Sequence, residues 1–203
     1  MFTGIIAAVG RITRSEPLGQ ADAGLRLTIE AGVLGLDDVA LGDSIAIQGA
    51  CMTVVEKSGS SFTIDISRES LSKTVGLDGL GEVNLEKAVS LSTKLGGHLV
   101  TGHVDGIGEV VRFAPIGESH ELVVRSPGEL AKFIAYKGSV TVNGVSLTVN
   151  RVTDVAGGAE FSINLIPHTI GATTLKALKA GAQVNLEIDL IARYVERMLS
   201  APK

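Results

Sequence analysis

The midpoint of the 203-residue chain reads Gly96-Gly97-His98-Leu99-Val100-Thr101-Gly102-His103-Val104-Asp105-Gly106. Its second half repeats the start of the chain. The segment Thr101-Gly102-His103-Val104-Asp105-Gly106-Ile107-Gly108 aligns with Thr3-Gly4-Ile5-Ile6-Ala7-Ala8-Val9-Gly10, at an offset of 98 residues. Self-similarity at a fixed distance indicates that one structural module occurs twice. Within this match, only the second copy has a histidine, His103, directly after its Thr-Gly pair.

Further matches follow along both halves in the same order. Residues 42–54 align with 137–149, and residues 62–66 align with 161–165. The segment Val83-Asn84-Leu85-Glu86 is identical to Val184-Asn185-Leu186-Glu187. The offset drifts only between 95 and 101 residues, so the insertions are small and fall in loops. The whole chain is therefore interpreted as an internal duplication.

Short runs rich in β-forming residues, bounded by Gly, Asp or Ser, recur in each half. Six strands are predicted in the first half, at 5–12, 24–30, 44–48, 52–57, 61–66 and 82–86. Six are predicted in the second half, at 106–113, 120–125, 139–142, 147–152, 160–165 and 183–187. This pattern predicts an all-β chain of two small antiparallel barrels. Matched short helices are expected at 37–41 and 128–136, and at 67–74 and 169–178.

The C-terminal tail has no counterpart in the first copy. From the N-cap candidate Asp189 onward, Ile191, Tyr194, Val195, Met198 and Leu199 follow helical spacing and predict one apolar stripe. A helix of about three turns is marginal alone in water. It therefore needs another surface, either its own chain or, as favoured here, copies of itself in an oligomer.

The composition excludes several classes of protein. The net charge is −4 and no run of basic residues exceeds two, so no nucleic-acid footprint is expected. No stretch approaches the roughly 18 apolar residues of a membrane span, and the N-terminus lacks a charged leader. The single Cys51 fits a reducing compartment. We expect a cytoplasmic protein without membrane or nucleic-acid partners.

Candidate functional residues are found at aligned positions where both copies have a small polar or sulfur-containing side chain. Cys51 aligns with Ser146 and Thr53 with Thr148, which suggests a pocket present twice, although a lone Cys is more often a small buried side chain. His103 replaces Ile5 after a glycine that allows close approach, although a lone His is usually structural. His98 and His120 carry less weight. No metal-ligand spacing and no nucleotide-binding glycine motif stands out.

Taken together, these segments resemble the riboflavin synthase family of the alpha-chain type, over essentially the whole chain. The resemblance rests on the opening Met1-Phe2-Thr3-Gly4-Ile5-Ile6, Gly49-Ala50-Cys51-Met52-Thr53-Val54, the midpoint stretch, Asn143-Gly144-Val145-Ser146-Leu147-Thr148-Val149, Ile166-Pro167-His168-Thr169 and Val184-Asn185-Leu186-Glu187-Ile188-Asp189. It implies two six-stranded Greek-key barrels, at 1–97 and 98–188, followed by an oligomerisation helix at 189–203.

The resemblance also implies an activity. Two molecules of 6,7-dimethyl-8-ribityllumazine would exchange a four-carbon unit, giving riboflavin and 5-amino-6-ribitylaminouracil, with no cofactor and no metal. The protein would be a homotrimer held partly by the C-terminal helix, with sites between the first barrel of one subunit and the second barrel of another. Because the electron-poor ring of that substrate makes a methyl group acidic, the protein would mainly orient two rings and move protons.

Two substrate pockets are carried over from the family. The first would use Gly4, Ile5, Ile6, Ser44, Cys51, Met52, Thr53, Asp65, Ile66, Ser67, Arg68, Glu69 and Ser70. The second would use Gly102, His103, Val104, Lys137, Ser146, Leu147, Thr148, Ile166, Pro167, His168, Thr169, Ile170 and Gly171. His103 is the predicted proton shuttle with Ser146 and Thr148 beside it. Cys51 and Ser44 would act in the partner pocket, with Lys137 and Asp189 in support.

The chain departs from the family pattern at few positions. They are Ala7-Ala8 for an acidic pair, Gln48 for Asn, Ser70 for Thr, and His168 where some members have Glu. The Ser70 and His168 changes bear on the contacts to the ribityl chain. The alternative reading is a non-catalytic lumazine- or flavin-binding protein of the same fold, and a further one is a structural barrel without a ligand.

Overall fold

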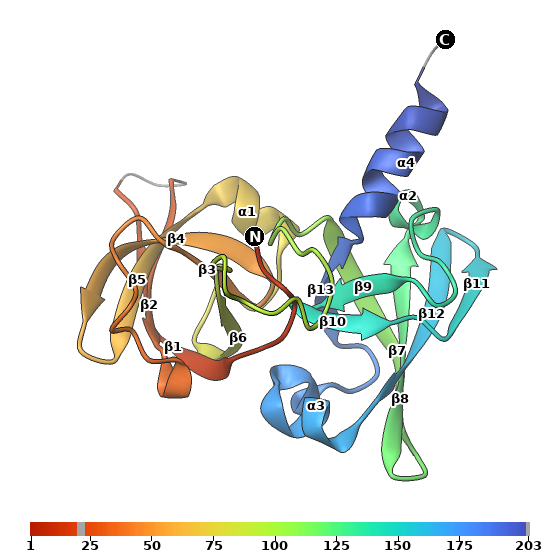
Figure 1. The fold of residues 1–203 in the computed structure, drawn as a ribbon, viewed down its shortest axis with the longest axis horizontal. Helices are drawn as coiled ribbons and strands as arrows, with labels where there is room; N and C mark the ends of the chain where they lie inside the picture. Colours follow the sequence, from red (N-terminus) through yellow and green to blue (C-terminus); the bar gives the residue numbers. More distant parts are fainter. Residues whose placement is uncertain (20–22, 202–203) are drawn as a thin grey trace.

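The computed structural model describes residues 1–19 and 23–201. The first copy forms a closed antiparallel barrel in the order β1-β2-β5-β4-β3-β6. Its strands are β1 (Ala8–Pro17), β2 (Gly24–Glu30), β3 (Ser44–Ile47), β4 (Ala50–Ser58), β5 (Ser61–Ser67) and β6 (Gly81–Lys87). Strands distant in sequence are neighbours, β2 with β5 and β1 with β6, as in a Greek key. Figure 1 shows this barrel in red to yellow beside the second copy in green to blue.

The second copy has the same order but seven strands, β10-β9-β13-β7-β8-β12-β11. They are β7 (Gly106–Ile116), β8 (Ser119–Pro127), β9 (Ser139–Val142), β10 (Val145–Thr148), β11 (Arg151–Val155), β12 (Gly158–Leu165) and β13 (Gln183–Ile188). The two strands at the ends of this order, β10 and β11, follow each other directly in the chain, so the sheet curls to bring its two edges together. They correspond to β4, which also changes partner midway, from β3 to β5. In the second copy this change of partner, from β9 to β12, falls in the gap between β10 and β11. The strand expected there is therefore split in two, which gives seven strands instead of the expected six.

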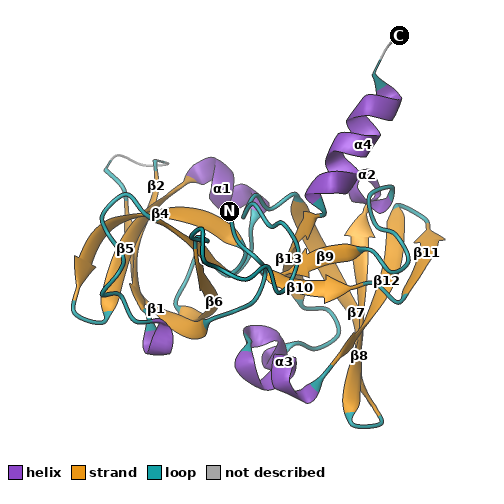
Figure 2. Ribbon diagram, in the orientation of Figure 1, coloured by secondary structure: helices purple, strands orange, loops and turns teal. Residues whose placement is uncertain are grey.

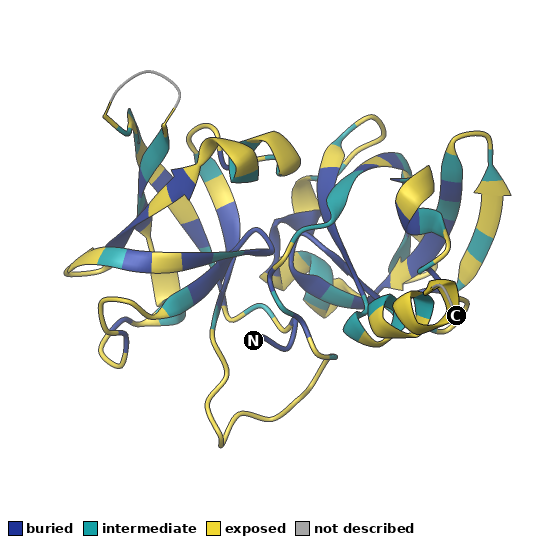
Figure 3. Cartoon of the chain, turned by 90° about the horizontal axis from the view of Figure 1, so that it is seen from above, coloured by how far each residue is buried: buried dark blue, intermediate teal, exposed yellow. Residues whose placement is uncertain are grey.

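The interior of each copy is filled with apolar side chains. Figure 3 shows the buried residues of the strands in dark blue. Phe62 occupies the first interior and Phe161 the second, and both are almost completely buried. Along β4 the buried residues Ala50, Met52 and Val54 alternate with more exposed ones. Since the interior positions are occupied by this core, the outward-facing alternate positions, Cys51 among them, are the ones available to a ligand.

The two copies meet at the tips of equivalent hairpins. Gln48-Gly49 joins β3 to β4, and Asn143-Gly144 joins β9 to β10; all four residues have positive φ, between 51° and 90°. This is the signature of type I′ turns. A Cβ added to Gly49 would lie 2.7 Å from the backbone nitrogen of Gly144, so only glycine permits this contact.

A buried amide network surrounds the hairpin tips. The side chain of Asn84 donates to the carbonyl of Asn143 at 2.9 Å, and that of Asn185 donates to the carbonyl of Gln48 at 2.9 Å. The side-chain oxygens of Gln48 and Asn143 in turn accept the backbone N–H groups of Asn84 and Asn185. Gln48 therefore performs the role of Asn143, in spite of its departure from the family pattern.

The helical expectations are met only in part. Helix α1 (Arg68–Lys73) is present, and α3 (Pro167–Ala172) with the short 3-10 helix η2 (Thr174–Ala177) matches it in the second copy. The helix expected at 37–41 is absent and the segment forms turns. In these turns the N–H of Ala40 donates to the carboxylate of Asp43, and the carbonyl of Val39 accepts from the ammonium of Lys57 rather than from a helical N–H. The segment expected at 128–136 is helical only in α2 (Gly128–Ala131), and a 3-10 helix, η1 (Gly32–Leu34), was not anticipated.

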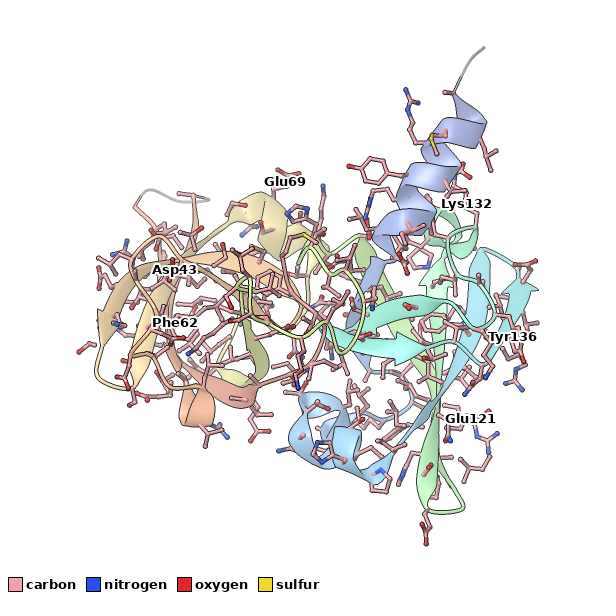
Figure 4. The ribbon with its side chains drawn as sticks, in the orientation of Figure 1. Asp43, Phe62, Glu69, Glu121, Lys132 and Tyr136 are labelled. Atoms are coloured by element: carbon pink, nitrogen blue, oxygen red, sulfur yellow. The ribbon has the colours of Figure 1, made fainter. Side chains whose placement is uncertain are left out.

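The predicted C-terminal helix is present as α4 (Leu190–Ser200), and it projects away from the barrels (Figure 2). Asp189 caps it by accepting the N–H of Ile191, as expected. Its base is tied by the ion pairs Arg193–Asp105 and Lys132–Glu196 (Lys132 is labelled in Figure 4). The apolar stripe is exposed, with Tyr194 63% and Met198 74% accessible. No helix in the described part of the chain is long and apolar enough to cross a bilayer.

Candidate active site

Two segments, named the first arm (residues 3–7) and the second arm (residues 101–105), cross between the copies, one at the start of each repeat. The first strand begins at Ala8 rather than at Ile5, because the preceding arm leaves its own barrel. The carbonyl of Gly4 accepts the N–H of Ser146 at 2.7 Å, and the carbonyl of Gly102 accepts the N–H of Cys51 at 2.8 Å. Each arm therefore lies on the hairpin of the other copy.

The first hollow, named the Cys51 pocket, combines both copies. Ala50, Cys51 and Met52 come from β4, and Glu69 (labelled in Figure 4), Ser70, Lys73 and Thr74 come from α1 and its end. Gly102, His103 and Val104 of the second arm close it, leaving a volume of about 270 Å³. Lys73 is paired with Glu69 at 2.9 Å, so a cation and an anion lie at the rim.

The second hollow, named the Ser146 pocket, is the counterpart. It is lined by Gly4, Ile5 and Ile6 of the first arm, by Val145 and Ser146, and by His168, Thr169, Ala172 and Thr173, around a volume of about 120 Å³. The expected grouping of the arms is therefore wrong within one chain. Ile5 faces Ser146, and His103 faces Cys51, because the arms are exchanged. His103 consequently does not lie beside Ser146 and Thr148 of its own chain.

A different histidine contacts Ser146. The Nδ1 atom of His98 is 2.7 Å from Ser146 Oγ, and its backbone N–H donates to the carbonyl of Thr3 at 3.1 Å. Gly97 makes this approach possible, since a Cβ there would lie 2.1 Å from the carbonyl oxygen of Thr3. Sequence reasoning gave His98 little weight, although the Gly-Gly before it was a signal of close packing.

Burial decides the protonation of His98. Its surroundings lower the pKa of the imidazole, and the negative charge of Asp189 opposes this shift only in part. At neutral pH the ring is therefore neutral and can accept the proton of the Ser146 hydroxyl. The pair can relay a proton between a bound molecule and the imidazole. No hydrogen bond to Cys51 Sγ is formed within the described residues, so the two pockets differ chemically.

Several expected pocket residues lie elsewhere. Asp65 projects from the barrel wall in a two-point ion pair with Arg26 at 2.7 and 2.8 Å, which lowers its pKa, and Ile66 is part of the first core. Ser67 caps α1, while Arg68 lines a separate hollow of about 580 Å³ with Leu71.

The remaining expected residues lie next to the pockets or in their walls. Ser44 and Thr53 are cross-strand partners, as are Ser139 and Thr148. The ammonium of Lys137 reaches Asn150 Oδ1 at 3.0 Å. Leu147 and Ile170 pack on the second core, and Ile166, Pro167 and Gly171 form the ends and surface of α3. No cluster of metal-ligating side chains occurs in residues 1–19 and 23–201.

The chain matches a known family model in two segments. The model, described as the lumazine binding domain, matches residues 3–88 and again residues 101–189. The chain belongs to the lumazine-binding domain family. The two matched segments coincide with the two repeats, so the duplication and the family resemblance predicted from the sequence are confirmed.

Curated relatives match the chain over its full length. Riboflavin synthase of Photobacterium phosphoreum is 44% identical, over 100% of this chain and 91% of that protein. Riboflavin synthase of Brucella abortus is 41% identical over 100% of both chains. Among solved structures, LumP complexed with riboflavin is similar with a TM-score of 0.81 and 26% identity, over 93% of this chain and 99% of that chain. LumP complexed with 6,7-dimethyl-8-(1′-D-ribityl) lumazine gives a TM-score of 0.79 at 25% identity.

Proposed function

We propose that this protein is a riboflavin synthase, converting two molecules of 6,7-dimethyl-8-ribityllumazine into riboflavin and 5-amino-6-ribitylaminouracil. The observation that carries the proposal is the pair of pockets at equivalent places in the two repeats. A reaction between two identical molecules requires two related binding sites. Full-length relatives named riboflavin synthase support the same activity.

The two pockets are related in shape and unequal in chemistry. The Cys51 pocket is lined by His103, with the Lys73–Glu69 pair at its rim. The Ser146 pocket is lined by His168, and His98 reaches it only through its contact with Ser146 Oγ. Identical substrates that end as different products need different treatment, one losing and one gaining the four-carbon unit. We assign the Ser146–His98 pair to proton transfer in one pocket and His103 to proton transfer in the other.

Each pocket is small for its proposed substrate. Hollows of about 270 and 120 Å³ fall below the roughly 300–1,000 Å³ of a typical ligand site. We propose that a homotrimer completes them, the Cys51 pocket of one subunit facing the Ser146 pocket of the next. The exposed stripe of α4 supports this assembly, because it is apolar and projects from the barrels.

The activity has a direct test. The protein is incubated with 6,7-dimethyl-8-ribityllumazine alone, and riboflavin is followed by its absorbance and fluorescence. Riboflavin and 5-amino-6-ribitylaminouracil are expected in equal amounts, without added cofactor or metal. Tight binding of one ligand per chain without product would instead support the alternative, a non-catalytic lumazine-binding protein.

The assembly has a separate test. Truncation before Asp189 removes α4 and its apolar stripe while leaving both barrels complete. We expect trimers for the full chain and monomers for the truncated chain by sedimentation or light scattering. The double variant Tyr194→Ser and Met198→Ser, which keeps the helix, is expected to act in the same direction. Trimers that persist in the truncated chain would remove α4 from the assembly.

Two further points belong to the proposal. The chain divides into barrels at 1–97 and 98–188 and an assembly segment at 189–203, although the crossed arms link the barrels. A cytoplasmic location is supported by the single cysteine, Cys51, which has no partner for an internal disulfide.

A further inference from the structure

Two buried carboxylates occupy equivalent places at the ends of β6 and β13. Glu86 is 6% exposed and Glu187 is 2% exposed. The carboxylate of Glu86 accepts the N–H and hydroxyl of Thr3, both at 2.7 Å, and the N–H of Gly4 at 2.9 Å. That of Glu187 accepts the N–H and hydroxyl of Thr101, at 2.7 and 2.8 Å, and the N–H of Gly102 at 2.9 Å.

The arm that each carboxylate holds continues onto the other barrel. Gly4, held by Glu86, accepts the N–H of Ser146, whereas Gly102, held by Glu187, accepts the N–H of Cys51. Both glycines have positive φ, 75° and 77°. A Cβ at Gly4 would lie 2.6 Å from the Cβ of Ser146, and one at Gly102 would lie 2.7 Å from the Cβ of Cys51. The arms therefore rest directly on the two pocket residues, and only glycine permits this close contact.

We propose that Glu86 and Glu187 are positioning residues that act crosswise: Glu86 sets the Ser146 pocket, and Glu187 sets the Cys51 pocket. Neither carboxylate lines the pocket that it sets. Each acts through three hydrogen bonds to a Thr-Gly pair and one further hydrogen bond to the opposite hairpin. The consequence for turnover rests on the proposed function, but the coupling itself does not.

An ionised carboxylate suits this position because it has only acceptors. Three donors converge on its two oxygens, two from backbone N–H groups that cannot turn away. A glutamine of the same shape has one oxygen and one NH2 group, so one N–H donor would face another donor. Burial raises the pKa of both carboxyls, and the donated hydrogen bonds oppose this only in part. Glutamine removes the cost of a buried charge, so the barrels are expected to stay folded while the arm loosens.

The chain holds a reporter for each pocket. Cys51 is its only cysteine, so its alkylation rate with iodoacetamide reports on the Cys51 pocket. His98 contacts Ser146 Oγ, so its imidazole NMR signals report on the Ser146 pocket. Both measurements are made on the full chain without substrate. A protein that makes no riboflavin would refute the proposed function and leave this test intact.

The two substitutions serve as controls for each other. In Glu187→Gln, Cys51 alkylation is expected to rise about fivefold, the factor that the loss of one buried hydrogen bond produces, with the His98 signals unchanged. In Glu86→Gln, the His98 signals are expected to shift while the Cys51 rate stays that of the parent. Equal effects of both variants on both reporters, or no effect of Glu187→Gln on Cys51, would overturn the crosswise coupling.

A milder pair of variants covers the case in which glutamine unfolds the chain. Thr101→Val and Thr3→Val each remove one hydroxyl donor and keep the shape of the side chain. They are expected to affect the same reporters, Cys51 for Thr101→Val and His98 for Thr3→Val, by smaller factors. Turnover adds a separate readout, since a positioning role predicts a lower kcat under conditions in which the variant is still fully folded.

Discussion

Replacement of Gly144 by alanine is expected to lower the free energy of unfolding by about 3 kcal/mol, from a steric collision together with backbone strain. Gly144 has a φ of 81°, and its new Cβ would lie 2.9 Å from both the Cα and the backbone nitrogen of Gly49. These are backbone atoms of the opposite hairpin, so no flexible side chain can give way. The two barrels would have to separate at their central contact, which is also surrounded by the buried Asn84 and Asn185 network.

Gly181 provides a matched control for this prediction. It has a φ of 82°, close to that of Gly144, but a Cβ there meets no atom within 4 Å. Gly181→Ala therefore carries the backbone strain alone, and a loss of about 1 kcal/mol is expected. Urea unfolding of both variants measures the difference. Equal losses would mean that the contact between the hairpin tips contributes nothing to stability.

Replacement of His98 by glutamine is expected to reduce kcat by about 100-fold, the lower range for the loss of a general acid–base group. The imidazole is 2.7 Å from Ser146 Oγ and receives or returns its proton in the proposed relay. Steady-state kinetics with 6,7-dimethyl-8-ribityllumazine measures the effect. His120→Gln is the control, since His120 is also partly buried but stacks on Phe113 in the wall of the second barrel. Similar losses in both variants would contradict the assignment.

The pH dependence follows from the direction of the His98 shift. Because burial lowers the pKa of His98, its neutral form persists below the ordinary value of about 6.5. The folded chain therefore binds the proton on His98 at a lower pH than the unfolded chain does. As a result, the free energy of unfolding decreases as the pH drops below the ordinary pKa value. We expect kcat to hold at pH 6.5 and to decline only under more acidic conditions. A decline centred above pH 6.5 would assign the relay to another group.

Local sequence patterns predicted much of the fold. The repeat of Thr3-Gly4 in Thr101-Gly102 predicted the duplication, and the run of β-forming residues at 24–30 predicted a strand that the structure confirms as β2. The apolar spacing after Asp189 gave α4. The helix predicted at 37–41 is wrong, because the carbonyl of Val39 is bonded by Lys57 of β4, a distant partner that a local pattern does not reveal.

The pockets could be predicted only in their composition. Aligned positions such as Cys51 and Ser146 identify residues of the same role, but a duplicated sequence does not tell which copy supplies each neighbour. Gly4 is therefore predicted to line the pocket of its own copy, although its carbonyl accepts the N–H of Ser146 in the other copy. His98 was underweighted for a similar reason, because its contact is made by the fold rather than by spacing.

The crossed arms also bear on how such a chain can arise and change. Equivalent arms exchanged between equivalent hairpins are the contacts of a symmetric dimer in which each partner lends a segment to the other. Joining two identical chains through a linker such as residues 88–97 would keep the exchanged contacts within one chain. After such a fusion, a mutation in the arm of one half changes the lining of the pocket in the other half. The difference between Ile5 and His103 is such a case, because each residue lines the pocket built on the hairpin of the opposite half.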